Sequence, residues 1–298
     1  MKILVSGSSG LIGSALVPAL ASAGHAVKRL VRRPPAPVGG EVRWDPKAGD
    51  LDAAALGEID AAVHLAGESI VGRWSAAKKR RIRDSRVKGT QALAQALTRL
   101  ARPPRALVCA SAIGYYGDRG SESLREDSAR GKGFLAEVCA EWEAAARPAE
   151  AKGVRVVNLR IGVVLSPKGG ALAKMLLPFR LGLGGIVGSG RQSMSWVSID
   201  DVVGIVQHVL ASEALRGPVN TVAPNPVTNL EFTRALGKVL RRPTIFPMPA
   251  FAARLAFGEM ADELLLASAR VEPAKLLATR YAFRHPRLEE ALAHLLRG

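Results

Sequence analysis

A glycine-rich turn close to the N-terminus constrains the fold of this chain more than any other feature. The apolar residues Ile3, Leu4 and Val5 lead into segment 6–13, Ser-Gly-Ser-Ser-Gly-Leu-Ile-Gly, and an apolar stretch with helical spacing follows to about Ala23. A second apolar segment covers residues 26–31. The turn therefore stands in a strand–helix–strand context, which is the context of a nucleotide-binding turn.

The spacing of the three glycines predicts a role for each. We expect Gly7 to permit the tight turn, Gly10 to leave room for a phosphate group, and Gly13 to let the helix pack closely on the strand. Backbone N–H groups at the start of the helix, where Leu11 and Ile12 stand, then face a pyrophosphate, whose negative charge the helix dipole favours. The alternative is an ordinary turn between a strand and a helix that binds nothing.

Two arginines, Arg32 and Arg33, end the second apolar segment just before Pro34 and Pro35. An acidic side chain about twenty residues beyond the glycines would accept hydrogen bonds from a free ribose 2′-hydroxyl group, whereas arginines suit a 2′-phosphate. The sequence therefore predicts NADP(H) as the cofactor, in preference to NAD(H). Alternatively, both arginines only face solvent.

Alternating apolar and helical segments predict an α/β fold with a doubly wound parallel sheet of the Rossmann type. Strands are expected at 2–6, 26–31, 41–44, 60–65, 105–111, 154–160 and 219–222, and helices at 11–23, 75–101, 134–152, 170–181, 199–212 and 228–240. At 298 residues the chain has room for a second unit. We expect a dinucleotide-binding core at 1–167 and 196–228, and a smaller, mainly helical C-terminal lobe on the substrate side at 168–195 and 229–298.

A formal net charge of +16 invites a nucleic-acid interpretation, which the basic run 78–83 supports locally. This run belongs to a segment that continues at helical spacing to Leu100, so we expect most of its charges to lie on a solvated helix face. The chain has few aromatic residues and no recognition motif. We therefore expect a small-molecule substrate and no specific nucleic-acid partner.

The two cysteines, Cys109 and Cys139, offer neither a metal-ligand spacing nor a disulfide framework, which favours a reducing compartment. No apolar run approaches the roughly 20 residues that a membrane span requires. Met1 and Lys2 lead directly into a short strand rather than into a signal sequence. These features predict a cytoplasmic protein with no membrane partner.

Four of the five histidines, His25, His208, His285 and His294, are scattered along the sequence and form no evident ligand pair. We therefore expect no metal site. Asp200 and Asp201 precede an apolar helical segment, and we expect them to cap that helix.

Several further motifs follow the glycine turn in a consistent order: Val63–Gly67, Ser111–Gly117, Leu159–Pro167 and Trp196–Val202. Together with the glycines they resemble the extended short-chain dehydrogenase/reductase superfamily, in its nucleoside-sugar epimerase and dehydratase group. The resemblance covers nearly the whole chain. It implies that Leu65, Ala66 and Gly67 lie along the adenine ribose and nicotinamide side of the cofactor.

The segment Ala66–Ile70, followed by Gly72-Arg73-Trp74, is more narrowly similar to an atypical subfamily, an uncharacterised epimerase family. Members of this subfamily carry a small C-terminal domain of unassigned role. The matching segment here runs from Phe257 to Pro286.

This chain departs from its catalytically standard relatives where they carry a Tyr and, four residues later, a Lys that lowers the pKa of the Tyr. The alignment places Leu135 and Cys139 at these two positions, and neither performs that chemistry. Ala112 stands at the position of the usual serine, with Ser111 one residue earlier. Arg86 replaces the usual Asn of the long helix, and we expect Arg86 to take over a cofactor-binding role.

Four polar residues near the carboxyl ends of strands are the remaining catalytic candidates: Ser111, Tyr115, Tyr116 and Glu68. Each has a structural alternative. In that alternative the two tyrosines only pack beneath the nicotinamide, Ser111 only bonds to backbone, and Glu68 caps a helix or pairs with Arg73. We also expect Ser111 to line the cofactor site.

The sequence thus leaves two main functions open. One is an NADP(H)-dependent epimerase or oxidoreductase that acts on an unidentified small polar substrate. The other is a non-catalytic NADP(H) sensor or protein-interaction module, which the missing Tyr and Lys favour.

Overall fold

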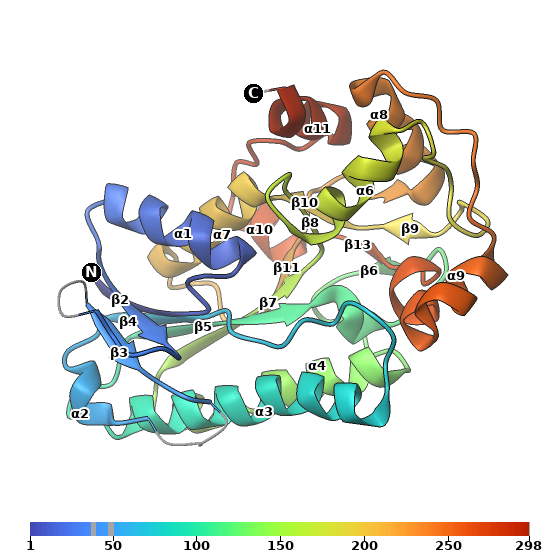
Figure 1. The fold of residues 1–298 in the computed structure, drawn as a ribbon. Helices are drawn as coiled ribbons and strands as arrows, with labels where there is room; N and C mark the ends of the chain where they lie inside the picture. Colours follow the sequence, from blue (N-terminus) through green and yellow to red (C-terminus); the bar gives the residue numbers. More distant parts are fainter. Residues whose placement is uncertain (37–39, 47–50, 298) are drawn as a thin grey trace.

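The computed structural model describes residues 1–36, 40–46 and 51–297. Its central sheet contains the strands β1 (Lys2–Ser6), β2 (Ala26–Val31), β3 (Glu41–Arg43), β4 (Ala61–His64), β5 (Ala106–Ala112), β7 (Arg155–Ile161) and β11 (Gly217–Thr221). They are hydrogen-bonded in the order β11-β7-β5-β4-β1-β2-β3, and each neighbouring pair is parallel (Figure 1). The order reverses beside β1, so the carboxyl ends of β1 and β4 flank the crevice where such sheets bind ligands.

Helices cover both faces of this sheet. The helices are α1 (Leu11–Ser22), α2 (Ala53–Leu56), α3 (Ala76–Thr98), α4 (Phe134–Ala144), α5 (Arg147–Glu150), α6 (Gly170–Arg180), α7 (Ile199–Ala211), α8 (Asn229–Leu240), α9 (Ala250–Phe257), α10 (Ala274–Ala278) and α11 (Leu288–Arg297). Figure 1 shows α1 and α7 on one face, and α3 with α4 on the other. Two layers of helices therefore enclose the sheet, as in a doubly wound fold.

The alternation of side chains along β1 explains why both faces are covered. Ile3 and Val5 pack in one core cluster with Leu16 of α1, whereas Leu4 packs in a second cluster with Leu97 of α3. Successive side chains of a strand point to opposite faces, so a fully apolar strand needs a partner layer on each side.

The predicted fold class is confirmed, and the predicted strands of the central sheet lie within two residues of those observed. One predicted helix, 134–152, is wrong as a single element, because α4 ends at Ala144 and α5 begins at Arg147. Pro148 lacks an N–H group and cannot donate to the carbonyl of Ala144, which interrupts the helix.

The second lobe gathers around α6, α8 and α11, whose buried side chains form a separate cluster that includes Leu176, Phe232 and Leu292. Three short strand pairs, which the sequence pattern did not predict, join distant segments: β8 (Val163–Leu165) with β10 (Trp196–Ser198), β9 (Ser193–Met194) with β12 (Val227–Thr228), and β6 (Ser123–Leu124) with β13 (Arg270–Val271). Leu276 of α10 packs in the core cluster of the main sheet. The chain beyond residue 229 thus returns to the core, and the proposed domain boundaries stay a prediction.

The basic run 78–83 lies in the first turns of α3. Arg80 and Arg81 are exposed, as expected, but three other cations of the run form ion pairs. Lys78 lies 3.0 Å from Glu68, Lys79 lies 2.7 Å from Glu259, and Arg83 lies 3.3 Å from Glu137. Three cations of the run therefore bind carboxylates of other segments.

Within the described ranges, we find no helix with the length and apolar character needed to cross a membrane.

Candidate functional site

The glycine turn joins β1 to α1 and has room for glycine alone at two positions. Gly7 has a φ of 70°, and a Cβ atom there would lie 2.7 Å from the carbonyl carbon of Leu65. A Cβ atom at Gly13 would lie 2.2 Å from the carbonyl oxygen of Gly7. Both distances are shorter than any ordinary contact, so side chains at these positions would push the turn away from β4 and α1.

Gly10, by contrast, is exposed and begins α1 as its N-cap residue. No side chain caps this N-terminus, and the first turn of α1 carries no acidic residue. The N–H groups at the start of α1, including those of Leu11 and Ile12, thus remain available to an anion. The turn fits a pyrophosphate group.

The side chain of Leu11 closes one side of this turn. A Cβ atom at Gly169 would lie 3.2 Å from its Cδ1 atom, and one at Gly170 would lie 3.1 Å from its Cδ2 atom. The loop before α6 therefore reaches the start of α1 from the second lobe. The sequence pattern did not predict this contact.

The two arginines after β2 differ in their surroundings. The Nη2 atom of Arg33 donates a hydrogen bond of 2.7 Å to Oε1 of Glu41, which also lies 2.8 Å from Arg29. Arg32 is exposed and has no hydrogen-bond or ion-pair partner among the described residues. Arg32 is thus the guanidinium group that is open to solvent, whereas Arg33 is held by Glu41.

Arg86 of α3 lies against the turn that follows β4. A Cβ atom at Gly67 would lie 3.4 Å from its Cζ atom. The Nη1 atom donates hydrogen bonds to the backbone oxygens of Glu68 at 3.0 Å and Ile82 at 3.2 Å, and the guanidinium lies 5.0 Å from the ring centroid of Trp142. Burial lowers the pKa of Arg86 from its usual value. The structure brings together the glycine turn, Gly67 and Arg86, and the cofactor role of Arg86 stays a prediction.

A buried polar network lies at the carboxyl ends of β5 and β7. Ser111 donates a hydrogen bond of 2.8 Å to Oε1 of Glu143. Arg160 holds the same carboxylate through two hydrogen bonds of 2.9 Å, and its Nη1 atom donates to the hydroxyl oxygen of Tyr116 at 3.0 Å. Burial alone would lower the pKa of Arg160, but the hydrogen bond and charge of Glu143 raise it. Glu143 and Arg160 thus form the centre of a network that the sequence analysis did not assign.

This network distinguishes the two tyrosines. Tyr116 is fully buried, and its hydroxyl group donates to Oδ1 of Asn220 at 2.7 Å. Burial raises the pKa of Tyr116, although Arg160 opposes that shift. Tyr115 is half-buried under the guanidinium of Arg160, 3.5 Å from its ring centroid, and its hydroxyl group has no partner within the described ranges. Tyr115 is therefore partly open to solvent, whereas Tyr116 is not.

Glu68 pairs with Lys78 rather than with Arg73, which donates instead to the backbone oxygen of Leu255. The backbone N–H of Glu68 donates a hydrogen bond of 2.9 Å to Oγ of Ser85. Both structural alternatives for Glu68 are therefore wrong, because Lys78 rather than Arg73 is its partner and Ser75 is the N-cap residue of α3.

Leu135 and Cys139 occupy the first turns of α4, beside the turn that contains Tyr115. A Cβ atom at Gly114 would lie 3.3 Å from Cβ of Leu135 and 3.8 Å from Sγ of Cys139. Both residues are buried, and burial raises the pKa of Cys139 to about 12. The structure thus provides an uncharged thiol and an aliphatic side chain next to this turn.

A cavity of about 300 Å³ opens beside these residues. The core contributes Gly114, Gly117, Asp118, Lys132 and Leu135 to its wall, and the C-terminal region contributes Arg254, Asp262, Glu263, Leu266 and Ala267. The carboxylate of Glu263 accepts hydrogen bonds of 2.7 Å from the backbone N–H groups of both Phe134 and Leu135. The segment Ala261–Leu265 therefore caps α4 and completes the cavity wall. Nothing in the sequence pattern indicated this, because the two sides lie about 130 residues apart.

The structure corrects the interpretation of the late histidines as scattered. The rings of His285 and His294 stack with centroids 4.4 Å apart, and both approach Asp200. The capping prediction for α7 is also wrong, because Ser198 is its N-cap residue and accepts a hydrogen bond from the backbone N–H of Asp201 at 3.0 Å. The sequence pattern gave no indication of this arrangement, because a loop brings His285 back to the start of α7.

Comparison with known proteins agrees with this geometry. Residues 3–221 match the model of the NAD dependent epimerase/dehydratase family, and residues 248–295 match a domain of unknown function, DUF1731. The chain belongs to the NAD dependent epimerase/dehydratase family. The resemblance found in the sequence motifs is therefore confirmed.

Among its relatives is the Epimerase family protein MT2273 of Mycobacterium tuberculosis, which is 47% identical over 98% of this chain and 96% of its own length. The human Epimerase family protein SDR39U1 is 40% identical over 99% of this chain and 100% of its own length. A crystal structure of human SDR39U1 isoform 2 with NADPH superposes with a TM-score of 0.93 at 38% identity and covers 100% of both chains. UDP-glucose 4-epimerase of Thermus thermophilus, in complex with NAD, shares the fold alone, at 21% identity and a TM-score of 0.78 over 100% of this chain and 99% of its own.

Proposed function

We propose that this protein binds NADP(H) at the edge of the sheet where β1, β2 and β4 end. The observation that carries the proposal is the pairing of a glycine turn open to a pyrophosphate with an exposed Arg32 at the ribose position. The N-terminus of α1 would hold the pyrophosphate, and Arg32 would bind the 2′-phosphate through charge-assisted hydrogen bonds. The NADPH in the structure of human SDR39U1 supports this proposal.

Members of the same fold that are solved with NAD show that the fold does not choose between the two cofactors. The choice depends on the residue that meets the ribose. An acidic side chain there would repel a 2′-phosphate, whereas Arg32 attracts it. The cofactor preference therefore rests on Arg32 rather than on family membership.

We expect Arg32→Ala to weaken NADPH binding by about 1.5–3 kcal/mol, which corresponds to roughly 10- to 100-fold in Kd. Binding of NADH should change little, because NADH has no 2′-phosphate. Isothermal titration calorimetry with both nucleotides measures the effect. The adjacent variant Arg33→Ala is the control and should lose less, since Arg33 is already paired with Glu41. Equal losses for NADPH and NADH in Arg32→Ala would remove the 2′-phosphate assignment.

We further propose that the protein is an oxidoreductase or epimerase whose small polar substrate binds in the cavity lined by Gly114, the residue before Tyr115. NADP(H) would supply the hydride chemistry, and the protein would bind and orient the substrate. Lys132, Asp118 and Glu263 give this cavity charged groups of both signs, which suits a polar ligand. Among the four catalytic candidates, Tyr115 is the half-buried residue whose hydroxyl group has no protein partner in the described part of the chain.

A second function, an NADP(H) sensor without catalytic activity, is supported by Leu135 and Cys139. Neither side chain provides an acid or base beside the cavity, because one is aliphatic and burial raises the pKa of the other to about 12. In that case the C-terminal region, which caps α4 through Glu263, would report the state of the nucleotide site to a partner.

A screen of oxidoreductase and epimerase substrates with NADP(H) separates these two functions. If the protein is an enzyme, Tyr115→Phe should reduce kcat by about 10²–10⁴-fold, the range expected when a general acid or base is lost. NADPH affinity should stay unchanged in this variant. Tyr116→Phe is the matched control, since its hydroxyl group is buried and hydrogen-bonded. Full turnover of Tyr115→Phe on an identified substrate would exclude Tyr115 as the proton-transfer group, and tight NADPH binding without any turnover would favour the sensor.

A further inference from the structure

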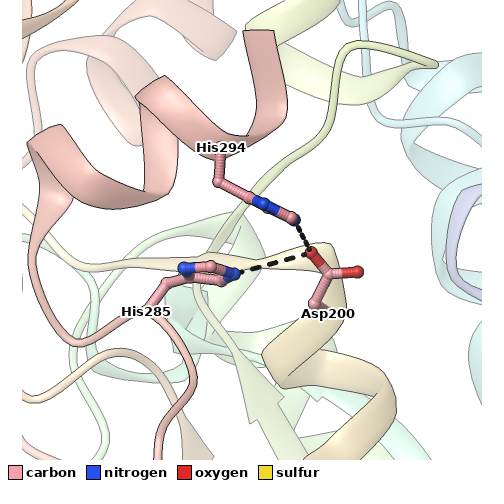
Figure 2. Close-up of side chains that lie close together, drawn as sticks. All are labelled: Asp200, His285 and His294. Carbon is pink, nitrogen blue, oxygen red and sulfur yellow. Dashed lines mark hydrogen bonds and ion pairs between the residues drawn. The ribbon is translucent and has the colours of Figure 1, made fainter. Parts of the chain in front are cut away.

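Two histidines and one aspartate from three distant segments meet between α7 of the core and α11 of the second lobe. Asp200 lies in the first turn of α7, His285 in the loop after α10, and His294 on α11 (Figure 2). One ligand atom from each of the three residues lies within 4.8 Å of the other two. Figure 2 shows that both imidazole rings turn their Nε2 atoms toward the same carboxylate oxygen.

We propose that Asp200, His285 and His294 form a binding site for a divalent metal ion of the zinc type. Two imidazole nitrogens and one carboxylate oxygen are a donor set that Zn²⁺ accepts, with a water molecule as the fourth ligand. The carboxylate contributes one negative charge, and the neutral imidazoles contribute nitrogen donors of borderline softness.

The two distances from the carboxylate oxygen to the imidazole nitrogens suit this ion. Ligands about 2.0–2.1 Å from a tetrahedral ion are about 3.3–3.4 Å from one another. The Oδ2 atom of Asp200 lies 3.1 Å from Nε2 of His294 and 3.8 Å from Nε2 of His285. These two separations lie on either side of the tetrahedral value. Hydrogen bonding explains only the shorter one, because 3.8 Å is too long for a hydrogen bond.

The chain holds His285 in place through a neighbouring residue. The buried carboxylate of Asp201 accepts hydrogen bonds from the backbone N–H groups of Arg284 at 2.7 Å and His285 at 3.1 Å. Asn225 donates a hydrogen bond of 3.0 Å to the backbone oxygen of Pro286. The loop that carries His285 is therefore fixed against the start of α7 on both sides. Fixed ligands lose little freedom when they bind a metal, which favours a real site over a chance encounter of side chains.

His294 is fixed by the packing of α11. Leu288, Ala291 and Leu292 of this helix are buried in the cluster that α6 and α8 share. The side chain of His294 is 53% exposed, whereas that of His285 is 17% exposed, so an ion can enter from solvent on the side of His294. A bound ion would join α11 to α7 and thereby fasten the end of the chain to the core.

The test uses the full chain after treatment with a chelator and dialysis. Calorimetric titration with ZnCl₂ should show one equivalent bound, and Zn²⁺ at about 100 times its Kd should raise the Tm by several degrees. The single variants His285→Ala and His294→Ala should each weaken Zn²⁺ binding by more than about 100-fold and lose the Tm shift, because each removes a direct ligand. Both variants should bind NADPH as the unmodified chain does, and this result would show that both are folded.

His25→Ala is the matched control. His25 lies beside the N-terminal amino group, 3.3 Å away, and so offers Zn²⁺ an alternative pair of nitrogen donors. This variant should bind Zn²⁺ as the unmodified chain does. The proposal is overturned if Zn²⁺ does not change the Tm of the unmodified chain, if His285→Ala and His294→Ala respond to Zn²⁺ as fully as the control, or if His25→Ala abolishes binding.

Discussion

Glu143→Gln is expected to lower the free energy of unfolding by about 3–5 kcal/mol, the usual cost of breaking a buried ion pair from one side. Glu143 receives two hydrogen bonds from Arg160 and one from Ser111. The side chain of Arg160 is 3% exposed, so water cannot replace the lost carboxylate. Glutamine keeps the size of the side chain but removes its charge and turns one acceptor into a donor that faces the guanidinium.

Denaturant unfolding of Glu143→Gln and of the unmodified protein measures this difference in the free energy of unfolding. Glu58→Gln is the matched control, because Glu58 makes an ion pair with Lys2 in which both side chains are more than half exposed. An exposed pair of this kind contributes little, so the control should unfold at the same denaturant concentration as the unmodified protein. If Glu143→Gln is as stable as the control, the ion pair between Glu143 and Arg160 does not stabilise the folded protein.

Gly13→Ala is expected to abolish measurable NADPH binding and to destabilise the protein by about 1–3 kcal/mol, the typical cost of overpacking. The added Cβ atom would lie 2.2 Å from the carbonyl oxygen of Gly7, so α1 or the turn must move. Either movement displaces the N–H groups that would hold the pyrophosphate. The same calorimetric titration that tests Arg32 measures the loss.

Gly89→Ala provides the control for this substitution. Gly89 lies inside α3, and a Cβ atom there would meet Cβ of Pro46 at 3.6 Å, which is an ordinary contact. Alanine also favours a helix interior by about 1 kcal/mol relative to glycine. Gly89→Ala should therefore bind NADPH normally and be at least as stable. If Gly13→Ala binds NADPH as tightly as Gly89→Ala does, the glycine turn is not the pyrophosphate site.

The central fold could be predicted because each of its elements shows a local pattern. Strands such as β1 are continuous apolar runs, and α1 begins at a glycine turn whose spacing follows from steric limits at Gly7 and Gly13. The order of these elements also predicts which edge of the sheet carries the proposed cofactor site. Arg32 was assigned from its distance to the glycine turn and Arg86 from the resemblance to the family, and both assignments stay predictions.

The polar network and the cavity could not be predicted, since they depend on contacts between distant segments. Glu143 and Arg160 lie on a helix and a strand that meet only in the folded chain, and Glu263 reaches α4 from the C-terminal region. The short strands β6 and β13 have two residues each, too few for a periodic pattern. His285 and His294 are nine positions apart and one of them lies in a loop, so helical ligand spacing gave no indication of their contact.

Titration of the unmodified protein with NADPH and with NADH tests the proposed cofactor site most directly. A single class of site should bind NADPH about 10- to 100-fold more tightly than NADH, because the 2′-phosphate adds charge-assisted hydrogen bonds to Arg32. That preference should disappear in Arg32→Ala. Equal affinity for the two nucleotides in the unmodified protein, or tighter binding of NADH, would contradict the assignment of this edge of the sheet to NADP(H).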